Sequence, residues 1–201
     1  MQYDPKTRKF LNGDKYVSHL ETREAIDRLL AFIKKESARY AKAFNDGKLS
    51  PDEFNFAMRE LLKAGHIVSS SVGRGGRERM SAGDWARVGR KIKWQYGFLD
   101  KFTRKLKAGT PINVRSRAAA YVDAIYISYA DSFKEAQTEN RPTGEVLVQL
   151  VQNSEEGCVE CAADAALGFI PVSEMGEIGT RICGDWCKCD LEFRDADGNE
   201  V

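Results

Sequence analysis

Apolar side chains recur at helical spacing over most of the first 140 residues. In the first such stretch, residues 20–44, they are Ile26, Leu29, Ile33, Tyr40 and Phe44. Steps of three, four or seven residues place side chains on one face of an α-helix. The pattern therefore predicts a helix over residues 20–44, which the turn-forming pair Asp46-Gly47 should end.

A second helix has the clearest start signal in the chain. Ser50 is a natural N-cap, Pro51 suits the first helical turn, and Glu53 completes the spacing of a capping box. The Gly-, Ser- and Arg-rich segment 69–84, SSSVGRGGRERMSAGD, follows and is interpreted as a loop or hinge. On this interpretation His66 lies at the frayed end of the second helix, as a surface or capping residue.

Two further helices are expected before residue 140. One begins near Ser81, has Asp84 at capping-box spacing, and carries the stripe Trp85, Val88, Ile92, Gln95, Leu99, Phe102 and Leu106. Gln95 is the one polar break in that stripe. The other helix spans residues 114–138, with Ala118, Tyr121, Val122, Ile125, Tyr129 and Phe133 on its inner face.

The pattern changes after the segment Asn140-Arg141-Pro142-Thr143-Gly144. EVLVQLVQ and LGFIPV are strand-like, and CDLEFR alternates so that Cys189, Leu191 and Phe193 share one face. The sequence thus predicts an α+β fold with a helical domain over residues 1–140, whose first 17 residues form an extended arm with turns. A small β-rich C-terminal module is expected over residues 145–201.

Charge is distributed unevenly, although the formal net charge is only +1. Residues 74–117 hold thirteen Lys/Arg against three acids, whereas residues 145–201 hold thirteen acids against three Lys/Arg. Such asymmetry is typical of a protein that meets a polyanion or an acidic partner. Alternatively, the two parts neutralise each other within one chain or between copies.

The N-terminus, MQYDPKTRKF, is polar and lacks the apolar core of a signal peptide. No apolar run approaches the roughly 20 residues that a transmembrane helix needs. We therefore expect synthesis in the cytosol, no membrane association, and reduced thiols.

All five cysteines fall within residues 158–189, as C-x2-C, then 21 residues, then C-x3-C-x-C. Two short-spaced clusters of this kind are typical of a structural zinc site, in which four thiolates fill a tetrahedral ion. The candidate ligands are Cys158, Cys161, Cys183, Cys187 and Cys189. The first four are the favoured set. Cys189 is either a buried apolar filler or a replacement for Cys183 or Cys187.

Disulfides and unligated thiols are the alternatives to zinc. An odd cysteine count without a secretion signal argues against disulfides. A redox C-x2-C would need a thioredoxin-like βαβ context, which the pattern lacks. A zinc ion would contribute folding free energy to a module too small to have a large core of its own.

The segment from Cys158 to Arg194 resembles the C-terminal cysteine module of Mu-F-like minor head, or head morphogenesis, proteins of tailed phages. The likeness rests on the C-x2-C, the small-residue stretch ending at Gly168, the FIPV strand, and Cys187-Lys188-Cys189 before an acidic-aromatic strand. Many such modules end in His-x2-C-x-C, and here Cys183 stands one residue further upstream. The helical stretch GRGGRERMSAGDWARVGRKIKWQYGFLDKF and the start YDPKTRKFL are also similar to short phage head-associated proteins.

The resemblance implies a non-catalytic virion component, made in the host cytoplasm and located in the head near capsid or portal proteins, in multiple copies. In the head, its basic helix would pack against those proteins or touch packaged DNA. The alternative hypothesis is a free-standing nucleic-acid-binding protein whose basic helix and arginine loop contact phosphate, with zinc in a structural role. Its predicted contacts with DNA or a partner are Arg74, Arg77, Arg79, Arg87, Arg90, Lys91, Arg104 and Lys105. A solvated basic face and an interhelical hinge are the plainer explanations of these residues.

The sequence contains no G-x-S-x-G, H-E-x-x-H or Walker A motif. His19 and His66 are its two histidines, and neither has a Cys or Asp at triad or metal spacing. No deaminase signature accompanies the C-x2-C, because the His-x-Glu and P-C-x-x-C elements are missing. We therefore expect no enzymatic activity.

Overall fold

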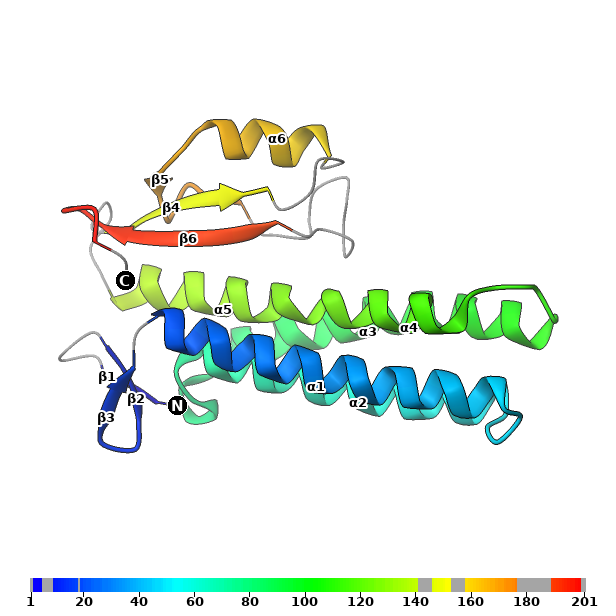
Figure 1. Ribbon diagram of the computed structural model, residues 1–201. Coiled ribbons are helices and arrows are strands. Elements are labelled where there is room, and N and C mark those ends of the chain that lie inside the picture. The colour runs from blue at the N-terminus through cyan, green and yellow to red at the C-terminus, as the bar shows by residue number, and fades with distance from the viewer. Residues whose placement is uncertain are drawn as a thin grey trace.

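The computed structural model describes residues 2–4, 9–17, 19–140, 146–152, 158–176 and 189–199. Its described part is mostly helical, with long helices side by side and a small antiparallel sheet against one of them (Figure 1). This confirms the expected α+β class. Among the described helices, none combines the length and the apolar character needed to cross a membrane.

Helix α1 (His19–Asn45) ends and helix α2 (Pro51–Arg74) begins where the sequence predicts, on either side of the turn between them. Gly47 adopts a left-handed conformation with φ 72°, as expected after a helix end. At the start of α2, the Ser50 hydroxyl accepts from the Glu53 N–H, and the Glu53 carboxylate accepts from the Ser50 N–H. The predicted capping box is therefore confirmed.

The hinge expected at residues 69–84 is wrong over residues 69–74, because α2 continues to Arg74. Gly75, with φ 76°, ends the helix, and the short 3-10 helix η1 (Arg77–Arg79) follows. The small residues of this last part of α2 are buried against α5. A Cβ on Gly73 would lie 2.5 Å from the Tyr129 carbonyl oxygen and 2.8 Å from the Phe133 nitrogen. Close helix packing thus explains the Ser/Gly composition that resembled a loop.

Helix α3 (Ala82–Lys107) begins with the predicted capping box between Ser81 and Asp84. The single helix expected over residues 114–138 is divided into α4 (Val114–Asp123) and α5 (Ile125–Asn140). The interruption is one residue, Ala124, whose backbone remains right-handed helical. Helix α2 lies centrally and packs against α1, α3 and α5.

The N-terminal arm forms a three-stranded antiparallel sheet of β1 (Gln2–Asp4), β2 (Lys9–Asn12) and β3 (Lys15–Val17). The expected turn at Asn12-Gly13 joins β2 to β3, while Pro5 lies outside the described residues. Phe10 of β2 is buried and stacks on Phe133 of α5, with ring centroids 5.5 Å apart. This contact attaches the arm to the helices.

A second antiparallel sheet has the order β5-β4-β6, formed by β4 (Val146–Val151), β5 (Ile170–Pro171) and β6 (Asp190–Asp195). These strands confirm the three predicted ones. Helix α6 (Val159–Ala166) was not expected and lies between β4 and β5 in the chain. In Figure 1 it lies on the outside of the molecule, away from α5.

The two parts on either side of residues 141–145 share a hydrophobic core. Val146, Val148 and Phe193 belong to one buried cluster that also contains Ile127 and Phe133 of α5. The Phe193 and Phe133 rings meet edge to face, with centroids 4.8 Å apart. The C-terminal module is therefore stabilised partly by apolar contact with the helices.

Candidate functional site

The C-x2-C pair lies at the start of α6. Cys158 is the N-cap residue, and its Sγ accepts a hydrogen bond from the Cys161 N–H at 3.4 Å. Cys161 is buried, and Cys158 is half-buried. A backbone N–H directed at sulfur favours the thiolate, which is the form that binds metal. The local geometry is thus suited to a pair of metal-binding thiolates.

Cys189 lies immediately before β6 and is buried in the same hydrophobic cluster as Cys161, with Cys158 packed against that cluster. Cys189, Leu191 and Phe193 are all buried, which confirms the predicted shared face. Cys183 and Cys187 fall within residues 177–188, outside the described residues. Three of the five candidate ligands therefore come from segments that share one core.

Zinc remains a prediction. Within the described ranges, no group of three or more His, Cys, Asp or Glu side chains is arranged to hold a metal ion. The donor chemistry fits zinc at Cys158 and Cys161, because both are thiols at the spacing of half a site and one already accepts an N–H. The remaining ligands would come from Cys183, Cys187 and Cys189.

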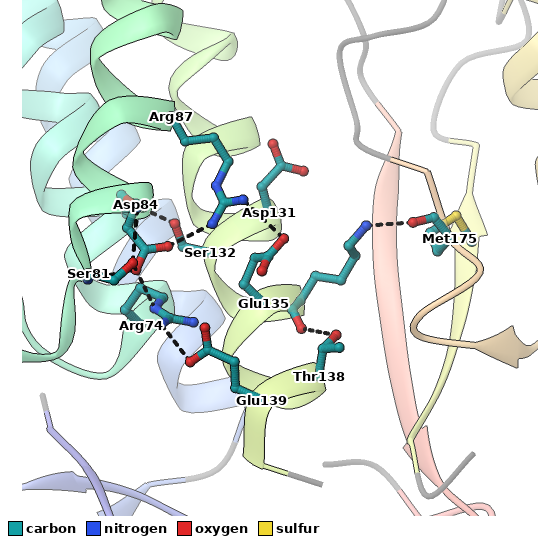
Figure 2. A network of polar contacts seen from close by, with 12 residues as sticks. Arg74, Ser81, Asp84, Arg87, Asp131, Ser132, Glu135, Thr138, Glu139 and Met175 are labelled. Carbon is teal, nitrogen blue, oxygen red and sulfur yellow. Dashed lines mark hydrogen bonds and ion pairs between the residues drawn. The ribbon is translucent and has the colours of Figure 1, made fainter. Parts of the chain in front are cut away.

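Three of the eight residues predicted to contact DNA or a partner lie instead in polar contacts between helices, and Figure 2 shows two of them, Arg74 and Arg87. Arg74 Nε lies 3.0 Å from Asp84 Oδ2, and Arg74 Nη2 lies 2.7 Å from Glu139 Oε2. Arg87 pairs with Asp84 at 2.8 Å and with Glu135 at 3.2 Å, and Lys91 pairs with Asp131. These charges connect α2 and α3 to each other and to α5.

Asp84 is at the centre of this network and is itself buried. Burial acts to raise its pKa, but hydrogen bonds from Ser81 and Arg87 and the charge of Arg74 together hold the pKa below its ordinary value. The carboxylate therefore stays ionised inside the protein. It acts both as part of a helix cap and as the counter-ion of two arginines.

The other five predicted contact residues lie closer to solvent. Arg77, Arg90, Arg104 and Lys105 are exposed, and Arg79 is half-buried. Arg77 lies over the Trp85 ring, with its guanidinium carbon 5.3 Å from the centroid. A basic surface therefore lies along η1 and the outer side of α3. Arg74, Arg87 and Lys91 are not part of it, because they pair with carboxylates between the helices.

His66 was interpreted as a surface or capping residue, and that interpretation is wrong. It is buried between α2, α3 and α5, with Nδ1 2.7 Å from Ser128 Oγ and Nε2 2.8 Å from Gln95 Oε1. Gln95 donates its amide N–H to the Tyr121 carbonyl oxygen at 2.7 Å. Since Gln95 Oε1 can only accept, Nε2 carries the proton, and Nδ1 accepts from the Ser128 hydroxyl.

This hydroxyl–imidazole–amide chain resembles the order of a catalytic triad, but its surroundings differ. Ser128, His66 and Gln95 are all almost completely inaccessible to solvent, so no substrate can approach the hydroxyl in this conformation. The chain satisfies buried polar groups across four helices. The polar break at Gln95 and the small residues near His66 are the sequence features that fit such a buried partner, but they were not interpreted in this way.

We expect His66 to make the protein sensitive to mild acid. Burial lowers the pKa of His66 from 6.5 to about 4, with a smaller contribution from Lys91 in the same direction and an opposing one from Gln95. A depressed folded-state pKa means that stability is complete above pH 6.5 and is lost as the pH falls toward 4. Between pH 7 and pH 5 the loss from His66 should be about 2 kcal/mol.

The measurement is urea unfolding of the wild type and His66→Gln at several pH values. The variant should be less stable at pH 7 but should lose less stability on acidification, because glutamine does not titrate. Parallel pH profiles for the two proteins would contradict the assignment.

A second polar contact, not foreseen from the sequence, joins the C-terminal sheet to the helices. Arg23 of α1 donates to the Tyr126 hydroxyl at 2.8 Å and pairs with Asp190 of β6, and Tyr126 donates to the same carboxylate. The Arg23 guanidinium also lies over the Tyr126 ring, 4.3 Å from its centroid. Asp190 follows Cys189 directly, so this contact positions the chain beside a candidate ligand.

Lys134 makes a further connection between α5 and the C-terminal module. Its buried Nζ donates to the Met175 carbonyl oxygen (Figure 2). With the Arg23–Tyr126–Asp190 contact, this fixes the module on the helices at two places.

No protein-family model, curated protein or solved structure matches the chain. What the protein does must therefore be inferred from its own residues and from their geometry.

Proposed function

We propose that the chain is a structural component of a tailed-phage head, a minor head protein whose C-terminal cysteine module binds one zinc ion and attaches to capsid or portal proteins. The observation that carries the proposal is the arrangement of Cys158 and Cys161 at the N-terminus of α6, in the same core as Cys189. A zinc ion held by four thiolates has no open position for a substrate, so its role is structural.

The polar groups of the helical part support a structural role in the same way. The network around Asp84 and the chain through His66 join helices to each other, and Asp84 and His66 themselves are buried. Each group has a partner in another element, as in a rigid scaffold. A zinc ion would make the cysteine module rigid in the same way, because it would join segments that the short strands of the module hold only weakly.

DNA binding by the basic region is the weaker candidate. Arg74, Arg87 and Lys91 have carboxylate partners within the protein, which reduces the charge available to phosphate. DNA affinity falls with salt because bound phosphates release counterions. Each basic side chain that cannot bind a phosphate should make the slope of log affinity against log salt concentration shallower by about one. Tight DNA binding by the isolated chain that weakens steeply with salt would favour this alternative.

Substitution of the C-x2-C pair should remove the metal. We expect about one zinc per chain in the wild type and less than about 0.2 in Cys158→Ser/Cys161→Ser, because two of four ligands are removed. Elemental analysis of protein purified under reducing conditions measures both values. The double variant should also unfold at lower temperature, since metal binding is folding free energy.

Cys189→Ser provides the matched comparison for the metal assignment. Retention of zinc in this variant would identify Cys183 and Cys187 as the remaining ligands, whereas absence of zinc would place Cys189 among them. A metal-free wild type, or disulfides found by mass spectrometry of alkylated protein, would contradict the zinc centre.

The location in a particle is tested on purified virions whose genome encodes the chain. Quantitative mass spectrometry should detect the chain at a constant number of copies per particle, with a matching zinc content. A chain that is abundant in infected cells but missing from purified particles would refute the proposed role.

A further inference from the structure

Helix α6 presents an apolar face to solvent. Val159 is 75% exposed and Leu167 is 61% exposed, although both are large apolar residues. The members of this apolar face, all exposed, are Val159, Ala162, Ala163, Ala166 and Leu167. Their spacing of three, one, three and one places them on one side of a helix, opposite the buried Cys161. In most surface helices that apolar side faces the core.

Helix α3 carries a complementary surface, a basic-aromatic stripe of Arg90, Trp94, Phe98, Lys101 and Lys105. Steps of four, four, three and four residues align these side chains on one face. Trp94 is 46% exposed and meets Phe98 edge to face at 5.2 Å between centroids, and Lys101 lies over the Phe98 ring. The stripe thus has an aromatic centre flanked by cations.

The charges around the two surfaces are opposite. Residues 85–122 contain ten Lys/Arg and a single acid, Asp100, which is paired with Arg59. Among the described residues 158–176, which include α6, there are three acids, Glu160, Asp164 and Glu174, and no Lys or Arg. Within the described ranges no ion pair neutralises Arg90, Lys101 or Lys105, so the basic charge remains on the surface.

We propose that these two surfaces bind each other between copies of the chain, so that the apolar face of α6 in one copy covers the basic-aromatic stripe of α3 in the next. Both surfaces are exposed within one chain, so neither covers the other there. The alanines allow the Trp94 ring to approach the α6 backbone closely. Glu160 and Asp164 give α6 a negative charge, which is opposite to that of the cations flanking the stripe.

The aromatic centre of the stripe fits within the apolar face. The apolar face spans eight residue steps, about 12 Å, the pair Trp94 and Phe98 spans four, about 6 Å, and the whole stripe from Arg90 to Lys105 spans fifteen, about 22 Å. The aromatic pair can therefore contact the alanines while the cations reach the ends of α6. Because the contact joins two different surfaces, its repetition gives a ring or an open chain, not a closed dimer.

The test uses the full chain in sedimentation velocity over a range of concentrations, at low and high salt. The wild type should form species larger than a dimer, and high salt should weaken them, because the flanking charges are screened. Trp94→Ala/Lys105→Glu removes one surface, and Ala163→Arg/Leu167→Ser removes the other. Each variant alone should weaken association by about 30-fold or more.

Mixing the two variants provides the decisive result. One variant keeps an intact apolar face and the other keeps an intact stripe, so the mixture should form a 1:1 heterodimer and nothing larger. Phe56→Ala is the matched control, since Phe56 is 68% exposed on α2 and belongs to neither surface. This control should assemble like the wild type.

Three results would overturn the inference. A wild type that is monomeric at every concentration excludes the contact, and continued assembly by both variants places it elsewhere. Loss of assembly only in the α6 variant, without a heterodimer on mixing, would indicate that α6 pairs with itself. Since association between copies requires neither zinc nor a virion location, these outcomes are separate from those that test the proposed function.

Discussion

Replacing Gly73 with alanine is expected to destabilise the protein by about 3 kcal/mol or more. Gly73 lies where α2 crosses α5, and an added Cβ would be 2.5 Å from the Tyr129 carbonyl oxygen and 2.8 Å from the Phe133 nitrogen. These are backbone atoms of a helix and cannot move independently. The two helices must separate, which disturbs the nearby Ser70–Ser132 hydrogen bond. Chemical denaturation followed by circular dichroism measures the decrease in stability.

Two other helical glycines provide a graded comparison for Gly73→Ala. A Cβ on Gly65 would be 2.5 Å from Ile125 Cδ1 and 2.9 Å from Ile33 Cδ1, which are ends of flexible side chains, so the cost should be smaller. A Cβ on Gly97 would have nothing within 4 Å, so Gly97→Ala should stabilise the protein by about 0.5–1 kcal/mol. Similar effects at all three positions would show that α2 and α5 are not packed this closely.

Asp84→Ala should cost about 3–5 kcal/mol, because it removes one partner from a buried ion pair and leaves Arg74 inside the protein. Arg74 would retain only Glu139, which is exposed, and Arg87 would retain Glu135. The variant also loses the capping box that begins α3, which alone contributes about 1 kcal/mol. Equilibrium unfolding at neutral pH measures the total.

Asp100→Ala is the matched control for this second prediction. Asp100 lies on the same helix and pairs with Arg59, but both side chains are only half-buried, with 42% of the Asp100 side chain exposed, so its removal should cost less than that of Asp84, about 1 kcal/mol. The loss of stability in Asp84→Asn should lie between those of the two alanine variants. The asparagine amide keeps an oxygen acceptor for the helix cap but lacks the negative charge. Equal costs for Asp84→Ala and Asp100→Ala would contradict the assigned burial of the network.

Local signals accounted for most element boundaries. The capping boxes at Ser50 and Ser81 and the left-handed Gly47 could be predicted because each depends on residues within one turn of a helix. The strand face of Cys189, Leu191 and Phe193 could be predicted for the same reason, as it needs only alternation. These predictions required no knowledge of the rest of the chain.

The errors occurred where a distant segment changes what a residue does. Residues 69–74 have the composition of a loop. They are small because α2 and α5 approach each other closely there and leave no space for larger side chains. Nothing in the residues adjacent to His66 marks it as buried, because its role depends on Gln95 and Ser128, 29 and 62 positions away. Helix α6 was missed because its apolar spacing faces solvent and its cysteines suggested only a turn.

For the candidate site, the sequence by itself determined which thiols and which charges exist and how far apart they lie along the chain. Only the tertiary structure decided that Cys158, Cys161 and Cys189 share one core, and that Arg74, Arg87 and Lys91 are already bound to carboxylates. The physical reason is range. Helix caps, turns and periodicity are set by neighbours in sequence, whereas burial and ion pairing depend on segments that only folding brings together.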